Sequence, residues 1–127
     1  MQLAHIALYV QDLEGMKDFY VQHFGATANA KYHNPKTGLQ TYFLSFSSGS
    51  RLELMTRPGL TPRQQNSPAL GYNHIAFALG SRECVDALAQ ELAQAGCPIL
   101  SGPRITGDGY YEVSLLDPEG NLLELVA

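Results

Sequence analysis

Two short phrases occur twice in this chain, in the same order and at nearly the same spacing. HIALYV at 5–10 returns as HIAFAL at 74–79, and the tripeptide LEL stands at 52–54 and again at 123–125. Self-similarity of this kind indicates a tandem duplication of one structural unit. Each copy carries one histidine and one glutamate, separated by 48 positions in the first copy and 50 in the second. These four residues are His5, Glu53, His74 and Glu124.

Length and composition limit the class of protein. The 127 residues predict one compact domain, 1–127, made of a first module (1–56), a Pro- and Gly-rich linker (57–71) and a second module (72–127). The net charge of −4 argues against nucleic acid as a partner, because phosphates require a basic surface. No polybasic or long apolar run predicts contact with a membrane. Without a signal-peptide pattern or a CxxC motif, we expect a cytoplasmic protein.

Hydrophobic periodicity predicts the element order βαβββ in the first module. Residues 2–10 alternate as a strand does, and 12–24 have the spacing of an amphipathic helix. Asp12 is the expected N-cap of this helix and Gly25 its stop. Turn-rich segments then separate three further strands. We expect these strands at about 27–33, 40–46 and 51–56.

The second module repeats this order. A strand is expected at 72–79 and a helix at 82–95, with Ser81 as N-cap and Gly96 as C-cap. Three strands follow at about 98–105, 110–116 and 122–126. The predicted fold class is therefore α+β: two tandem βαβββ modules that form a curved mixed sheet around a central site.

Alternation along the strands separates the four repeated residues from the core. Each glutamate stands between two leucines in LEL, so it points away from the aliphatic face of its strand. The histidines alternate with aliphatic residues in the same way. One helix per module is expected to cover the aliphatic face, which leaves the histidines and glutamates on the uncovered, inward-curving face. Small neighbours keep that face hollow, namely Ala7, Ala76 and Ala78.

Two neutral imidazoles and two carboxylates are typical ligands of a borderline divalent ion. We predict that His5, Glu53, His74 and Glu124 bind one such ion per site, Zn²⁺ or Ni²⁺ first, with Co²⁺ and Mn²⁺ as alternatives. Two adjacent buried carboxylates without a cation would repel each other, which also favours a metal. Such a metal polarises a carbonyl group, while a carboxylate beside it transfers a proton. The small-molecule substrate and the native metal stay open.

Several motifs together resemble the vicinal oxygen chelate superfamily, also called the glyoxalase/bleomycin-resistance/dioxygenase fold. They are HIALYV…DFYVQHFG, RLELM, GYNHIAFAL and DPEGNLLEL, and they span essentially the whole chain. Within the superfamily, the pattern is similar to that of glyoxalase I (lactoylglutathione lyase), which uses His and Glu from both modules. This resemblance implies a metal-dependent lyase or isomerase that acts on an α-hydroxycarbonyl or thiohemiacetal through an enediolate. It also implies Glu124 as the catalytic base, with Glu53 as its partner.

Other activities of the same superfamily are alternatives. A ring-cleaving dioxygenase or a fosfomycin-type thiol transferase typically uses a His, His, Glu triad, so Glu53 counts against both. A non-catalytic small-molecule binding module generally lacks the four ligands. Where glyoxalase I binds the glutathione carboxylates, this chain has Tyr9 in the first position and Thr56 and Arg57 near the second. The resemblance further implies a homodimer, in which each site is built from one chain or from two.

Overall fold

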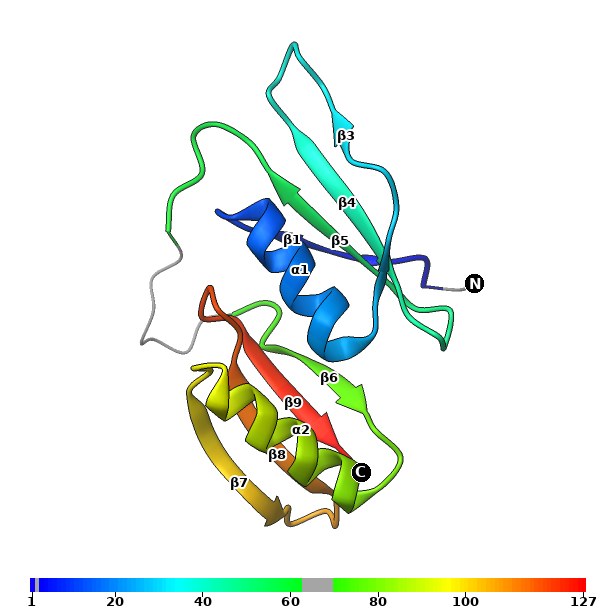
Figure 1. Ribbon diagram of the computed structural model, residues 1–127, viewed down its shortest axis with the longest axis vertical. Helices are drawn as coiled ribbons and strands as arrows, with labels where there is room; N and C mark the ends of the chain where they lie inside the picture. The colour runs from blue at the N-terminus through cyan, green and yellow to red at the C-terminus, as the bar shows by residue number, and fades with distance from the viewer. Residues whose placement is uncertain (2, 63–69) are drawn as a thin grey trace. The chain divides into compact units, whose positions relative to one another are not determined.

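The computed structural model describes residue 1, residues 3–62 and residues 70–127 (Figure 1). The chain divides into two compact units, Met1–Arg63 and Gln64–Ala127, and each contains one predicted βαβββ module. Within the predicted linker, residues 63–69 lie outside the described residues. In the part of the chain that the structure describes, no helix is long and apolar enough to cross a membrane.

The first module is a mixed five-stranded sheet with one helix. The order of the paired strands is β1-β5-β4-β2, and β3 also pairs with β4. Strand β1 runs parallel to β5, and the other pairs are antiparallel. The elements are β1 (Ile6–Tyr9), α1 (Leu13–Phe24), β2 (Thr27–Ala28), β3 (Tyr32–His33), β4 (Gln40–Ser45) and β5 (Arg51–Thr56).

Helix α1 begins and ends where the sequence predicts. The Asp12 side chain accepts a hydrogen bond from the Gly15 backbone N–H at 2.9 Å, which satisfies one of the free donors of the first turn. Gly25 ends the helix in the left-handed conformation, with φ of 63°. The helix buries one face against the sheet, through Leu13, Met16, Phe19 and Tyr20.

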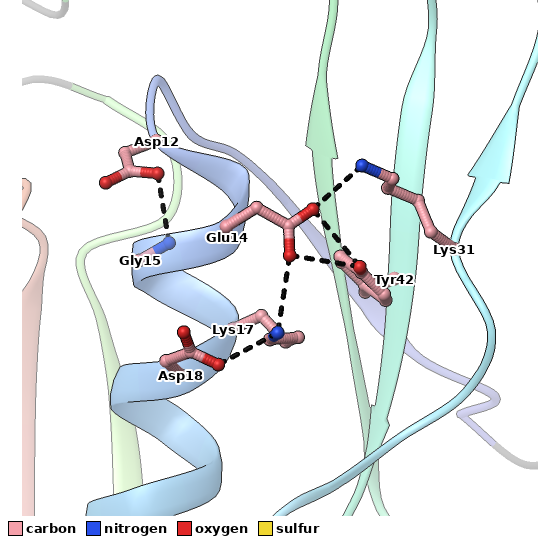
Figure 2. Close-up of polar contacts among 7 residues, drawn as sticks. All are labelled: Asp12, Glu14, Gly15, Lys17, Asp18, Lys31 and Tyr42. Carbon is pink, nitrogen blue, oxygen red and sulfur yellow. Dashed lines mark hydrogen bonds and ion pairs between the residues drawn. The ribbon is translucent and has the colours of Figure 1, made fainter.

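Polar contacts join α1 to the strands at the rim of this packing (Figure 2). Tyr42 of β4 donates its hydroxyl hydrogen to the Glu14 carboxylate, 3.1 Å away. The ammonium groups of Lys31 and Lys17 reach the same carboxylate at 2.8 and 3.3 Å. The hydrogen bond from Lys31, the largest effect, helps to lower the pKa of Glu14 below its usual value near 4.5. These contacts fix the helix on the face of the sheet that carries Tyr42.

The second module is a four-stranded mixed sheet with one helix. The strand order is β6-β9-β8-β7, with β6 parallel to β9 and the other pairs antiparallel. The elements are β6 (His74–Ala78), α2 (Arg82–Gln94), β7 (Ile99–Ile105), β8 (Tyr111–Leu116) and β9 (Leu122–Val126). In both modules the first strand therefore pairs in parallel with the last, and the helix links the first strand to the others.

Helix α2 starts at the predicted cap. The Ser81 side chain accepts a hydrogen bond from the Cys84 backbone N–H at 3.2 Å. At the other end the cap is Ala95, and not Gly96 as predicted. Gly96 follows with a φ of 94°, so it supplies the left-handed turn one position later. The helix covers one face of the sheet through Val85, Ala89 and Leu92.

Three predicted strands lose two or more residues in the structure: those expected at 27–33 and 2–10, and the one expected at 72–79, which is β6, His74–Ala78. The strand expected at 27–33 is divided into β2 and β3, because the Asn29 side-chain oxygen accepts the Phe43 backbone N–H at 2.8 Å. This side-chain contact replaces a backbone contact of the ladder. The strand expected at 2–10 is only β1, whose parallel pairing with β5 begins at Ile6 opposite Leu52. His5 therefore lies just before β1 and not within a strand.

Candidate metal centre

In the first module, the register places Glu53 at the middle of the face opposite α1. Its neighbours Leu52 and Leu54 are buried on the helix side, while the Glu53 side chain is 16% exposed. Two residues lie opposite Glu53 on the neighbouring strands, Ala7 on β1 and Phe43 on β4. Residues paired in this way share one face of the sheet. Ala7 is small and exposed, so space is left beside the carboxylate.

His5 contacts Glu53 on this face. The distance from His5 Nε2 to Glu53 Oε2 is 3.4 Å. The imidazole ring lies perpendicular to the Phe43 ring, with centroids 5.1 Å apart. The Arg51 guanidinium lies over the same phenyl ring at 5.2 Å from its centroid. Phe43 and Arg51 therefore form one side of this His–Glu pair, and alternation along the strands did not predict them as neighbours of His5.

The second module repeats the geometry around Glu124. Glu124 has Ala76 opposite it on β6 and Ser114 opposite it on β8. The distance from His74 Nε2 to Glu124 Oε2 is 3.1 Å. Thus an alanine of the first strand stands beside the glutamate of the last strand in both modules. The sequence repeat has become a repeated arrangement of two ligand-type side chains.

His74 has a second polar contact. Its Nδ1 lies 2.9 Å from the side-chain oxygen Oδ1 of Asn73, the preceding residue. The contact of Asn73 was not predicted, although the phrase GYNHIAF places an amide directly before the histidine. In a strand, adjacent residues point to opposite faces, so the alternation rule gives no reason to expect this contact. Asn73 precedes β6, where that rule does not apply.

Another charged pair lies on the same sheet of the second module. The Arg104 guanidinium Nη2 lies 2.7 Å from Glu112 Oε1, and the Glu112 side chain is 9% exposed. Glu112 stands two residues before Ser114 on β8, so both lie on the face that carries Glu124. The arginine neutralises a carboxylate that would otherwise be buried without a counter-charge. This face is therefore polar in the second module, whereas Phe43 takes the place of Ser114 in the first.

The spacing within each His–Glu pair fits two ligands of one metal ion. Two ligand atoms about 2.1 Å from one ion lie about 3.0 Å apart at an octahedral angle and about 3.4 Å apart at a tetrahedral angle. The observed separations of 3.4 and 3.1 Å are close to these values. Within the described residues of either module, no three His, Cys, Asp or Glu side chains form a group that could hold a metal ion. Each module thus holds one histidine and one glutamate of the predicted four.

Comparison with known proteins places this chain in a family. The model of the Glyoxalase/Bleomycin resistance protein/Dioxygenase superfamily matches residues 2–125. An uncharacterized protein of Pseudomonas aeruginosa is 35% identical over 96% of this chain and 85% of its own length. The glutathione transferase FosA of Serratia marcescens is 30% identical over 97% of this chain and 78% of its own length.

Solved structures agree with these matches. The trypanothione-dependent glyoxalase I of Leishmania major has a TM-score of 0.78 and 25% identity, with 99% of this chain and 86% of that chain covered. The fosfomycin resistance protein FosX of Listeria monocytogenes, solved with Mn(II), has the same TM-score at 24% identity, with 99% and 91% covered. The superfamily thus includes enzymes and proteins that bind divalent metals. The predicted resemblance is confirmed: this chain belongs to the glyoxalase/bleomycin resistance protein/dioxygenase superfamily.

Proposed function

We propose that this protein is a divalent-metal-dependent lyase or isomerase of the glyoxalase I type. Its substrate is a small α-hydroxycarbonyl compound or thiohemiacetal, and the reaction passes through an enediolate. One observation carries the proposal. Each module holds a histidine nitrogen and a glutamate oxygen at the separation of two ligands of one ion, 3.4 Å in the first and 3.1 Å in the second.

The proposed site combines the two pairs on one ion. His5 and His74 bind through Nε2 as neutral imidazoles, and Glu53 and Glu124 bind through carboxylate oxygens. This set of nitrogen and oxygen ligands suits Zn²⁺ or Ni²⁺, with Co²⁺ or Mn²⁺ as alternatives. The two pairs come together either within one chain or between the two chains of a homodimer. FosX, which has a similar fold, was solved with Mn(II), and this supports the proposal of a divalent metal in this chain.

When bound, the metal polarises the substrate carbonyl and holds the neighbouring oxygen. The protein's own groups do the rest of the work. The Glu124 carboxylate takes the proton from the hydroxyl-bearing carbon and returns it to the former carbonyl carbon, which is general base and then general acid catalysis, while the hydroxyl proton moves to the former carbonyl oxygen. Glu53 is its partner in the first module. The alanines opposite the two glutamates, Ala7 and Ala76, leave room for the substrate beside both carboxylates.

A second candidate function is thiol transfer of the fosfomycin-resistance type. The 30% identity to FosA, a glutathione transferase, favours it. The positions where glyoxalase I binds the glutathione carboxylates favour neither candidate, because both use a thiol; there this chain has Tyr9 and Arg57, with the Arg57 guanidinium 5.8 Å from the centre of the Tyr9 ring. Glu53 favours the lyase or isomerase, because it adds a second glutamate to the proposed ligands, and a set of two histidines and two glutamates suits proton transfer between carbons.

The test begins with the metal content of the purified protein. We expect about one divalent ion per site, lost on treatment with EDTA and regained with Zn²⁺ or Ni²⁺. The metal-loaded protein is then assayed with hemithioacetals of methylglyoxal and several thiols, and with fosfomycin plus glutathione. Turnover of a hemithioacetal that disappears in Glu124→Gln supports the proposal. Absence of a stoichiometric metal, or unchanged turnover in that variant, would refute it, and conjugation of fosfomycin alone would select the second candidate.

A further inference from the structure

The two modules hold their histidines by different means. The residue before His74 is Asn73, whereas the residue before His5 is Ala4. In the second module, His74 Nδ1 lies 2.9 Å from Asn73 Oδ1, a hydrogen-bond distance. In the first module, the His5 ring is packed perpendicular to the Phe43 ring. The second module therefore orients its histidine by a polar contact, and the first by an aromatic one.

The Asn73 contact selects one arrangement of protons on the His74 ring. An amide oxygen only accepts hydrogen bonds, so the contact requires a hydrogen on His74 Nδ1. A neutral imidazole carries a single N–H, and Nε2 then has a free lone pair. That lone pair faces Glu124 Oε2 at 3.1 Å. A cation between these two atoms, either a metal ion or the proton of an imidazolium, offsets the repulsion of their lone pairs, and in the metal-loaded protein the ion would take that place.

We propose that Asn73 is a positioning residue for the metal ligand His74. The Asn73 amide oxygen fixes the Nδ1–H form of the ring and directs Nε2 towards the ion. This inference rests on the proposed function, since it assigns a role around the same site. Partners of this kind on the second nitrogen of a ligating histidine orient the ring and raise its basicity. The His74 side chain is 35% exposed, so part of its surface is open to solvent.

We expect the two histidines to depend on different neighbours for their orientation. His5 is restrained by the Phe43 ring, which has no hydrogen-bond acceptor for Nδ1. The hydrogen bond to Asn73 has no counterpart at Ala4, because alanine has no polar side-chain atom. Loss of Asn73 should therefore affect metal binding although Asn73 itself is not a ligand.

The experiment measures Zn²⁺ affinity by competition with a chromophoric chelator. We expect Asn73→Ala to bind Zn²⁺ about 10- to 100-fold more weakly than the unaltered protein. Asn73→Asp keeps an acceptor oxygen and should retain most of the affinity. The matched control is Asn34→Ala, which removes an exposed amide whose oxygen accepts the Lys36 backbone N–H at 3.0 Å in the first module. This control should leave Zn²⁺ affinity unchanged.

A spectroscopic measurement separates positioning from a general structural effect. In ¹⁵N NMR of the Zn²⁺-loaded protein, the His74 Nδ1–H should be protected from exchange with water, and this protection should be lost in Asn73→Ala. Equal Zn²⁺ affinity in Asn73→Ala and the unaltered protein would overturn the inference and leave the proposed function intact. Equal losses in Asn73→Ala and Asn73→Asp would overturn it too. Failure of the unaltered protein to bind Zn²⁺ would instead remove the proposed function and the inference together.

Discussion

Neighbouring residues on β9 should have opposite roles, and substitution can separate them. Leu125 is completely buried on the helix side of the sheet, whereas Glu124 points to the other face beside His74. We therefore expect Leu125→Ala to reduce stability while metal binding is kept. Glu124→Gln should reduce metal binding while the metal-free protein keeps its stability. The two substitutions are one position apart, so they test the alternation on which the candidate site depends.

The size of each effect follows from the surroundings of each side chain. At about 0.8 kcal/mol per carbon removed, Leu125→Ala loses about 2.4 kcal/mol of transfer free energy. The cavity left in a packed core raises the total to about 2.7–5.0 kcal/mol. Glu124 is partly exposed, and its contact with His74 is of the kind that contributes about 1 kcal/mol or less. For metal binding, loss of a ligand should exceed the roughly 10- to 100-fold effect of losing an outer partner.

The assay is urea unfolding of the metal-free proteins followed by far-UV circular dichroism, since the chain has no tryptophan. Zn²⁺ affinity is measured in parallel by chelator competition. A destabilisation below about 1 kcal/mol in Leu125→Ala would contradict the burial of that side chain. A destabilisation of the metal-free Glu124→Gln variant as large as that of Leu125→Ala would show that Glu124 belongs to the core. Either result would refute the assignment of the two faces.

Two further predictions test the packing of the second module and the polar contacts of the first. Burial, and to a lesser extent Asp117, raises the pKa of the Cys97 thiol above its usual value near 9.0. A thiol reagent at neutral pH should therefore modify exposed Cys84 quickly and leave Cys97 unmodified until urea unfolds the protein. Rapid labelling of both cysteines in the native protein would contradict this. The hydrogen bond from Lys31 lowers the pKa of Glu14, so stability from this carboxylate is present above its unfolded pKa near 4.5 and lost as the pH falls through the lower folded value. Glu14→Gln should therefore flatten the fall in the urea midpoint at acid pH, and an unchanged pH profile would exclude the contribution.

Much of the fold was predictable because period-2 alternation and helix caps are local features. Asp12 and Ser81 cap their helices as expected, and the LEL phrases place leucines in the core and glutamates on the other face. The sequence could not show that Asn29 would interrupt a strand. That effect depends on a side-chain oxygen reaching the Phe43 backbone N–H from a neighbouring strand.

The sequence allowed prediction of the candidate site only as far as its two His–Glu pairs. Equivalent positions in the repeats bring His5 to Glu53 and His74 to Glu124, because each first strand lies parallel to the last strand of its own module. The convergence of both pairs on one ion stays a prediction, since it depends on how modules associate and not on alternation within a strand. Asn73 escaped prediction because its role comes from the reach of one side chain just outside a strand.

The alanine opposite each glutamate gives a test of the space that the reaction needs. Ala76 on β6 lies opposite Glu124 and is exposed, so Ala76→Leu should leave folding intact. The added carbons would occupy the place of a substrate oxygen beside the carboxylate. Crowding of this kind costs about 1–3 kcal/mol, which corresponds to about 5- to 150-fold weaker binding of a hydroxamate, a bidentate oxygen ligand, to the Zn²⁺-loaded protein.

The matched control for this substitution is Ala78→Leu on the same strand and face. Ala78 lies opposite Val126, which is two residues after Glu124 on β9, and Ala78 is also exposed. Hydroxamate binding is measured by calorimetry on the Zn²⁺-loaded variants, after each has been shown to unfold at the urea concentration of the unaltered protein. We expect a clear loss in Ala76→Leu and a smaller one in Ala78→Leu. If both substitutions weaken binding equally, or if neither does, the hydroxamate does not bind beside Glu124, and the small residue opposite this glutamate has no part in admitting the substrate.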